Sequence, residues 1–140
     1  MGGVWFSLAA AMLWGLSYAL DEKVMTTFSA RQMLLLHYVF GAIVSLVWIP
    51  LGDIASRARQ MSGQHALILA TSLSVTYLAG LLILTSISKV GATTAAVIEV
   101  SYPFWTALAA FLLFKEAMTL HQALGGTLIV LGVWVASKSA

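Results

Sequence analysis

Long apolar runs alternate with short polar segments along nearly all of the 140-residue chain. A helix needs about 20 apolar residues to cross the hydrocarbon core of a bilayer, and several runs come close to that length. The pattern predicts an all-α membrane protein with five transmembrane helices in a single domain, residues 1–140. The helices are expected at about residues 3–20, 33–51, 66–87, 92–114 and 120–136.

Short polar linkers separate these predicted helices. The two longest, residues 21–32 and 52–64, contain most of the charged side chains. The triplet Asp-Glu-Lys at residues 21–23 is interpreted as a solvated loop. Pro50 followed by Gly52 is expected to end the second helix, because these residues interrupt regular structure. No linker is long enough to form a domain outside the membrane.

Composition supports a lipid-facing surface. The hydrophobic fraction is 61%, the charged fraction is 9% and the mean hydropathy is +0.96, whereas soluble domains are about half apolar and about a quarter charged. The absence of cysteine excludes disulfides and thiol chemistry. The net charge of +2 is scattered between apolar runs, so no nucleic-acid partner is expected. We expect no metal or other cofactor, because the three histidines lack metal-ligand spacing.

A carboxylate lies deep within the fourth apolar run. Glu99 is about 10 Å from the start of its predicted helix, at a rise of about 1.5 Å per residue, and ionisable groups at such depth are usually functional. Pro103 has no N–H for the Glu99 carbonyl, so a kink is expected here. We interpret Glu99 as a proton- or cation-coupling site, or as a contact for a basic group of a substrate. The alternative is a protonated glutamate that hydrogen-bonds a hydroxyl of a neighbouring helix.

Polar and aromatic residues on three helices are candidates to line a cavity with Glu99, although each could instead only pack helix against helix. Aromatic walls suit organic molecules. The sequence contains no nucleophile–base set, paired carboxylates or phosphate-binding glycine loop, so no catalytic residue is assigned and no enzyme is expected. The candidate substrate-binding or coupling residues are Glu99, Tyr102, Pro103 and Thr106 in the fourth helix, Trp14 and Tyr18 in the first, and Thr76 and Tyr77 in the third.

Basic residues near the helix ends give almost no preference for one orientation. With five crossings, three Lys or Arg residues face one side of the membrane and four face the other, whereas orientation normally follows a clear excess on the cytoplasmic side. Such a chain can insert both ways, and two opposite copies would form the inverted pair typical of alternating-access transporters. The alternative is that one loop dominates and fixes the orientation.

The closing sequence IEVSYPFWTALAAFLLFKEAMTLHQALGGTLIVLGVWVAS combines several features. A proline lies inside one helix, an acidic residue lies at its end, and a glutamine and glycines lead into the next helix. These residues are Pro103, Glu116, Gln122, Gly125 and Gly132. The segment resembles the end of an EamA family unit, within the drug/metabolite transporter superfamily. The opening LWGLSYAL also resembles the family's first helix, through Trp14 and Gly15.

The resemblance implies a five-helix EamA-like unit that moves small metabolites, often outward. Typical members carry two such units, inverted relative to each other, whereas this chain carries one. We therefore expect a secondary transporter, exporting a small organic metabolite or drug-like solute by alternating access. It would work in a bacterial or archaeal type of plasma membrane, as a homodimer in antiparallel or parallel arrangement or with a second five-helix chain. The alternative is a non-transporting membrane scaffold or a partner subunit of a larger membrane complex.

Overall fold

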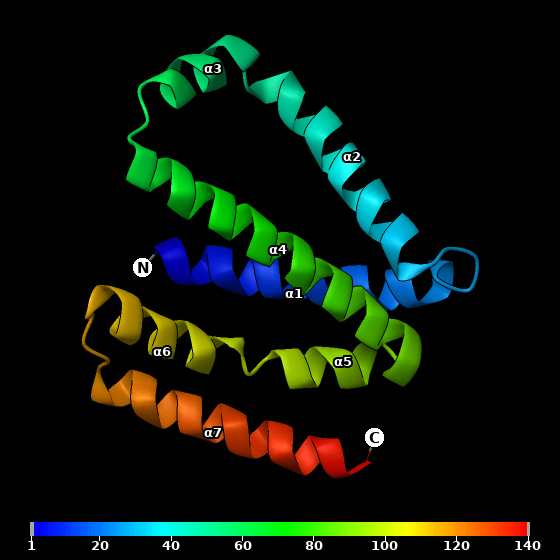
Figure 1. Cartoon of the computed structure of the whole chain (residues 1–140). Coiled ribbons are helices and arrows are strands. Elements are labelled where there is room, and N and C mark those ends of the chain that lie inside the picture. Colours follow the sequence, from blue (N-terminus) through cyan, green and yellow to red (C-terminus); the bar gives the residue numbers. More distant parts are fainter. Residues whose placement is uncertain (1, 140) are drawn as a thin grey trace. The chain divides into compact units, whose positions relative to one another are not determined.

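The computed structural model describes residues 2–139, and these residues form helices and turns without any strand (Figure 1). They fall into two compact units. The terminal unit comprises residues 2–23 and 86–139, and the middle unit comprises residues 24–85. The all-α fold class predicted from the sequence is therefore confirmed.

Within the described residues, four stretches are long and apolar enough to cross a membrane. At most 11% of the most apolar window of each stretch is buried, so the apolar side chains lie on the outside, as they do in helices surrounded by lipid. The four stretches are α1 (Gly2–Val24), α2 (Ala30–Trp48), α4 (Gly63–Val90), and α5 (Ala92–Glu99) together with α6 (Tyr102–Phe114). The remaining helices are α3 (Leu51–Arg59), the shorter apolar helix α7 (Leu120–Ala136) and the 3-10 turn η1 (Ser137–Ser139).

Two helices begin at capping boxes, in which a hydroxyl and a glutamine each satisfy a backbone N–H. At the start of α2, the Ser29 hydroxyl accepts from the Gln32 N–H at 3.4 Å, and the Gln32 side chain accepts from the Ser29 N–H at 2.8 Å. Thr119 and Gln122 form the same pair of bonds at the start of α7, at 3.3 and 2.9 Å. These boxes place the starts of α2 at Ala30 and of α7 at Leu120.

In the middle unit, α2 and α4 approach closely at a glycine. A Cβ added to Gly80 of α4 would lie 2.8 Å from the Leu34 Cδ1 of α2, which is closer than side-chain carbons normally come. Leu34 and its neighbour Met33 are among the few buried apolar side chains. Because small residues allow helix backbones to approach in lipid, Gly80 determines how near these two helices come.

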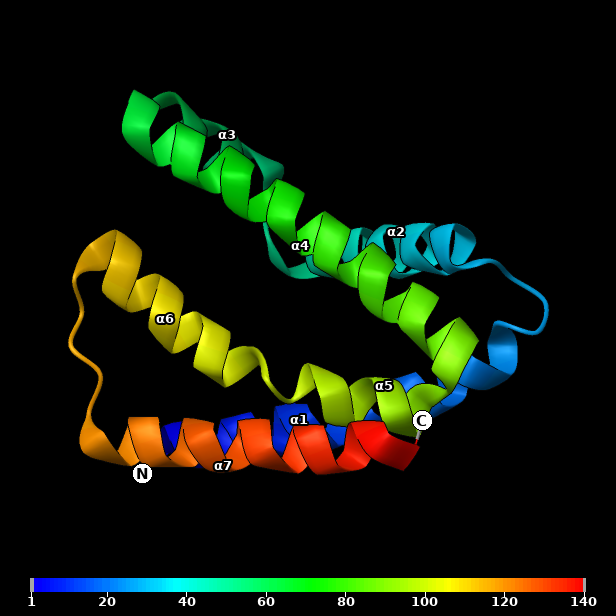
Figure 2. The same cartoon turned by 60° about the horizontal axis from the view of Figure 1, so that its bottom comes forward.

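The fourth predicted helix is interrupted and not merely kinked. α5 ends at Glu99 and α6 begins at Tyr102 (Figure 2). Pro103 occupies the first turn of α6, where its missing N–H is least costly because the first N–H groups of a helix have no partner within the helix. The same residue cannot donate to the Glu99 carbonyl. The predicted site of distortion was therefore correct, but its extent was underestimated.

The linker predicted at residues 52–64 contains the helix α3. Nine residues are too few to cross a membrane, so membrane-length apolar runs in the sequence do not reveal this helix. Leu51, Ile54 and Ala58 nevertheless recur at helical spacing, and this pattern was the available signal. The polar linker between the second and third predicted membrane helices is therefore largely helical.

The solvated loop predicted at residues 21–23 is also wrong, because α1 continues to Val24. Asp21 is buried, with 6% of its surface exposed. The Glu22 carboxylate accepts a hydrogen bond of 2.8 Å from the Ala92 N–H at the start of α5. Three consecutive charged residues usually indicate a solvent-exposed segment. Here, however, Glu22 accepts a hydrogen bond from a backbone N–H that is 70 positions away in the sequence.

Candidate substrate and coupling site

Two of the predicted site residues are joined directly in the terminal unit. The Tyr18 hydroxyl of α1 donates to the Glu99 Oε2 of α5 at 2.6 Å. That distance lies at the short end of the range for hydrogen bonds between oxygen atoms. Tyr18 is buried and Glu99 is half-buried. The two side chains therefore join α1 to α5 by one direct polar contact.

Trp14 extends this contact along α1. Its ring lies one helical turn before Tyr18, with ring centroids 5.8 Å apart and planes tilted by 53°. Tilted pairs at this separation are favourable aromatic contacts. The Trp14 side chain is mostly exposed, so it leaves an aromatic face open beside the Tyr18–Glu99 pair.

The break between α5 and α6 gathers oxygen atoms around Glu99. The N–H groups of Val100 and Ser101 bond the carbonyls of Ala96 and Ile98. Pro103 has no N–H, so the Glu99 carbonyl loses its helical donor. A helix carboxyl end carries partial negative charge. The side-chain carboxylate of Glu99 and its own carbonyl therefore lie together at the carboxyl end of α5.

α1 holds α5 at both of its ends. Glu22 caps the first N–H of α5, where the helix dipole favours a negative charge, and Tyr18 binds the residue that ends α5. Gly91 precedes α5 with φ +83°, in a region of backbone conformation that is unfavourable for residues with a Cβ. The order of the two contacts makes α1 and α5 antiparallel.

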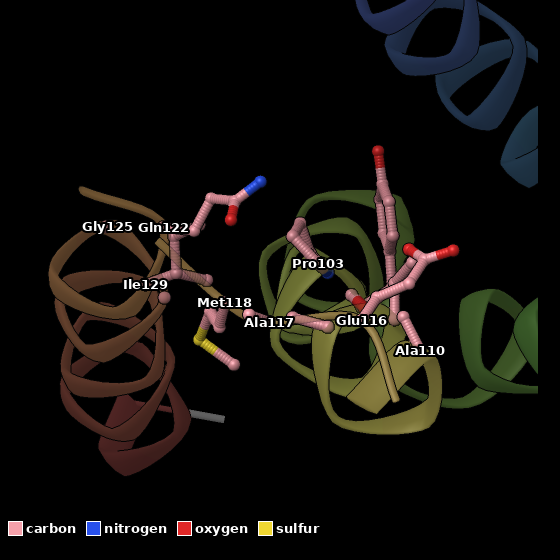
Figure 3. Close-up of a pocket in the computed structure, with 12 residues that line it drawn as sticks. Pro103, Ala110, Glu116, Ala117, Met118, Gln122, Gly125 and Ile129 are labelled. Atoms are coloured by element: carbon pink, nitrogen blue, oxygen red, sulfur yellow. The ribbon is translucent and has the colours of Figure 1, made fainter. Parts of the chain in front are cut away.

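A partly open cavity of about 550 Å³ lies between α6, the following linker and α7. Figure 3 shows Pro103 and Ala110 on the side of α6, and Gln122, Gly125 and Ile129 on the side of α7. Pockets of this size hold small organic molecules. The lining residues are Tyr102, Pro103, Thr106, Ala107, Ala110, Glu116, Ala117, Met118, Gln122, Gly125, Gly126 and Ile129.

The chain turns sharply to form one end of this cavity. Lys115 ends α6 in the left-handed conformation, at φ 60°, and its N–H bonds the Phe111 carbonyl at 3.0 Å. This is the usual way in which a residue after a helix satisfies one of the last carbonyls. The Thr119–Gln122 box then starts α7, which packs along both α5 and α6. Glu116 lies between these two fixed points.

A model of the EamA-like transporter family matches residues 1–138. The chain belongs to this family. It is therefore a multi-pass membrane protein of a transporter family, which fits the expectation that it is not an enzyme. Comparisons with curated proteins and with solved structures found no match. The resemblance stated from the sequence is confirmed over nearly the whole chain.

Residues that carry the EamA resemblance gather at the cavity. Pro103, Glu116, Gln122 and Gly125 all line it. Gln122 was identified from the sequence only as part of the motif; its side-chain oxygen accepts from the Thr119 N–H at 2.9 Å, so it also fixes the start of α7. The motif therefore contributes both to the fold of this EamA unit and to its cavity wall.

The cavity wall combines apolar surface with a few polar groups. Thr106 donates to the Tyr102 carbonyl at 3.0 Å, which orients its side chain on α6. Glu116 supplies the one carboxylate among the lining residues. Glu116 and Gln122 were not among the residues predicted to line a cavity, because nothing in the pattern of a single helix shows that α6 and α7 enclose a space.

Thr76 and Tyr77 belong to the middle unit, and their role in the site stays a prediction. The Tyr77 ring stacks on that of Tyr38, with centroids 6.1 Å apart and planes 17° from parallel. Thr76 is exposed on α4. The remaining candidates divide into the contact formed by Trp14, Tyr18 and Glu99 and the cavity wall that contains Tyr102, Pro103 and Thr106.

Proposed function

We propose that this EamA family member is a secondary transporter that exports a small organic solute through the terminal unit. The cavity between α6 and α7 is the substrate site, and Glu99 is the coupling group. The observation that carries the proposal is the break in the fourth span. It places a hydrogen-bonded carboxylate three residues before Tyr102, which lines the cavity. Interrupted helices of this kind supply substrate and ion sites in other transporters.

The Tyr18–Glu99 bond supplies the coupling step. While the carboxylate accepts from Tyr18, α1 and α5 are tied together. A proton or a cation that binds Glu99 competes with the hydroxyl for the same oxygen and weakens that tie. Because α6 follows directly after the break, a change at the end of α5 reaches the cavity wall within one helical turn. Binding at Glu99 thus alters the substrate site.

Alternating access requires a second unit in this proposal. Two copies in opposite orientation would provide the inverted symmetry on which such transport is built. The near balance of three and four basic residues on the two sides supports insertion in both directions. A second five-helix chain of opposite orientation would serve equally. The proposed location is the plasma membrane of a bacterium or archaeon.

Reconstitution of the purified chain in vesicles tests this function. Solute flux is measured for a panel of small organic solutes with and without a pH gradient. We expect at least one solute whose flux depends on the gradient, and we expect Glu99→Gln to abolish that dependence. Asp53→Asn, which removes an exposed carboxylate of α3, serves as the control and should keep it.

The outcomes separate the candidate functions. An unchanged pH dependence in Glu99→Gln would rule out Glu99 as the coupling group. A chain that moves no solute from a broad panel, alone or with a partner, would favour a scaffold or an accessory subunit. Flux that appears only after a second five-helix chain is added would show that the transporter is a heterodimer and not a homodimer.

A further inference from the structure

α3 is an amphipathic helix held between two membrane spans. α2 ends at Trp48 and α4 begins at Gly63, and α3 (Leu51–Arg59) joins them (Figure 1). Nine helical residues extend only about 13 Å, far less than the roughly 30 Å of a hydrocarbon core. The ends of α2 and α4 that flank α3 therefore lie at the same face of the membrane, and α3 lies at that face.

The side chains of α3 divide into an apolar face and a charged face. Leu51, Ile54, Ala55 and Ala58 recur at the spacing of one helical face. Leu51 is 64% exposed and Ile54 is 50% exposed, so the rest of the chain does not cover this face. An exposed apolar face of this kind, next to two membrane spans, fits the boundary between lipid head groups and acyl chains.

The charges of α3 select the kind of lipid. Asp53 lies in its first turn, and Arg57 and Arg59 lie in its last turn. The helix therefore carries a net charge of +1, with both arginines at one end. Guanidinium groups bind phosphate oxygens in pairs, and basic residues beside a membrane attract anionic lipids. We infer that α3 lies in the membrane interface and binds anionic phospholipid head groups through Arg57 and Arg59.

Fluorescent labels on the two faces of α3 test this inference in the full chain. The chain has no cysteine, so Ala58→Cys on the apolar face and Ser56→Cys on the polar face each give one labelling position. The proteins are placed in vesicles that contain nitroxide-labelled phosphatidylglycerol or, at equal mole fraction, nitroxide-labelled phosphatidylcholine. Both leaflets contain the probe lipid, so the orientation of the chain does not affect the result.

We expect the label at position 58 to be shielded from a water-soluble quencher and the label at position 56 to be accessible to it. The anionic probe should associate with position 58 about fivefold more strongly than the zwitterionic probe, the preference expected for one net charge at the interface. Arg57→Gln with Arg59→Gln should remove this preference. Arg57→Lys with Arg59→Lys should keep most of it, because the charge is retained.

A matched variant controls for net charge alone. Arg31→Gln with Lys89→Gln removes two exposed basic residues elsewhere and should leave the lipid preference at α3 unchanged. Equal quenching by both lipids in the labelled chain that keeps Arg57 and Arg59 would overturn the inference. Equal accessibility of the two labels to the water-soluble quencher would also overturn it.

Discussion

At the scale of single residues, the hydrogen bond from Tyr18 to Glu99 distinguishes this chain from a simple bundle of apolar helices. A carboxylate in a membrane span needs a partner, since few groups there can replace water. The donor is an aromatic hydroxyl, so the partner brings both a hydrogen bond and an apolar ring. The Tyr18 side chain therefore supplies Glu99 with a hydrogen-bond donor and brings an apolar ring into the same span.

Tyr18→Phe should separate the hydroxyl from the ring. The aromatic contact with Trp14 is kept, but Glu99 loses its donor. Hydrogen bonds within membranes contribute about 1 kcal/mol, so a decrease of that order is expected in the free energy of unfolding in detergent. In vesicles, solute flux should become less dependent on the pH gradient, because Glu99 can no longer form or release a hydrogen bond to α1.

Tyr38→Phe provides the matched loss of a hydroxyl in the middle unit. It should change neither the pH dependence of flux nor its size. If Tyr18→Phe lowers stability but leaves the pH dependence of flux as unchanged as Tyr38→Phe does, the hydrogen bond has only a local structural role.

Sequence reasoning identified Glu99 because its surroundings are unusual in a single segment. It also selected Tyr18, but only as part of a face of α1. A hydrogen bond between Glu99 and a hydroxyl of a neighbouring helix was one of the two interpretations, but the sequence could not identify Tyr18 as the partner, because that depends on how helices far apart in the sequence meet. Glu22 illustrates the same limit, since its role follows from the position of a backbone N–H and not from its charged neighbours.

At the scale of elements, the division of the fourth span into α5 and α6 matters most. α5 has eight residues, and isolated helices of that length are not stable in water. Its two ends are fixed by side chains of α1, and its start depends on the backbone of Gly91. α5 is therefore a separate element that α1 holds at both ends.

Gly91→Ala tests the backbone requirement. At φ +83° and ψ 159° a residue with a Cβ is strained, at a cost of about 1–3 kcal/mol. The added Cβ would meet the Glu22 carboxylate only at ordinary contact distance, 3.9 Å, so the backbone accounts for the loss. We expect a corresponding decrease in stability, measured by the loss of helical circular dichroism during unfolding in detergent.

Gly15→Ala is the control, because a Cβ there meets nothing within 4 Å and the residue lies inside α1. Alanine favours helix over glycine, so this variant should be as stable as the original chain or slightly more so. Equal stability of Gly91→Ala and Gly15→Ala would contradict the conformation assigned to Gly91.

The elements differ in how well the sequence predicted them. Membrane-length apolar runs were located by their hydropathy alone, which depends on composition over many residues and tolerates local variation. α3 was missed because it is short and polar on one side. The break after Glu99 was predicted as a kink, since the proline shows where a helical bond is lost but not whether the chain continues in the same direction.

At the scale of the whole molecule, the proposed transport mechanism depends on the orientation of the chain in the membrane. The fold class and the family followed from the sequence, because both rest on the order of apolar runs and a motif spread over two helices. The partner unit could not be predicted from the sequence, because no pattern within one chain shows which surface a second unit covers. The balance of basic residues is the one property that connects the sequence to this question.

A reporter fused to the C-terminus should be found on both sides of the membrane if the chain inserts in two orientations. Lys115→Gln and Lys89→Gln remove basic residues that the topology places on opposite sides. The two substitutions should therefore shift the ratio of inward-facing to outward-facing reporter in opposite directions, because orientation follows the distribution of Lys and Arg. Detection on one side only, in all three chains, would exclude dual insertion and favour a separate partner chain.

The attachment of α5 to α1 also has a consequence for biosynthesis. The two bonds join residues 70 and 81 positions apart, so α1 is made long before α5. At about 5–20 residues per second, roughly 4–16 seconds pass before Glu99 follows Tyr18 out of the ribosome. Until Ala92 is made, Glu22 lacks its backbone partner on α5. A chain that stops before Ala92 would retain this carboxylate without the N–H that it binds in the folded protein.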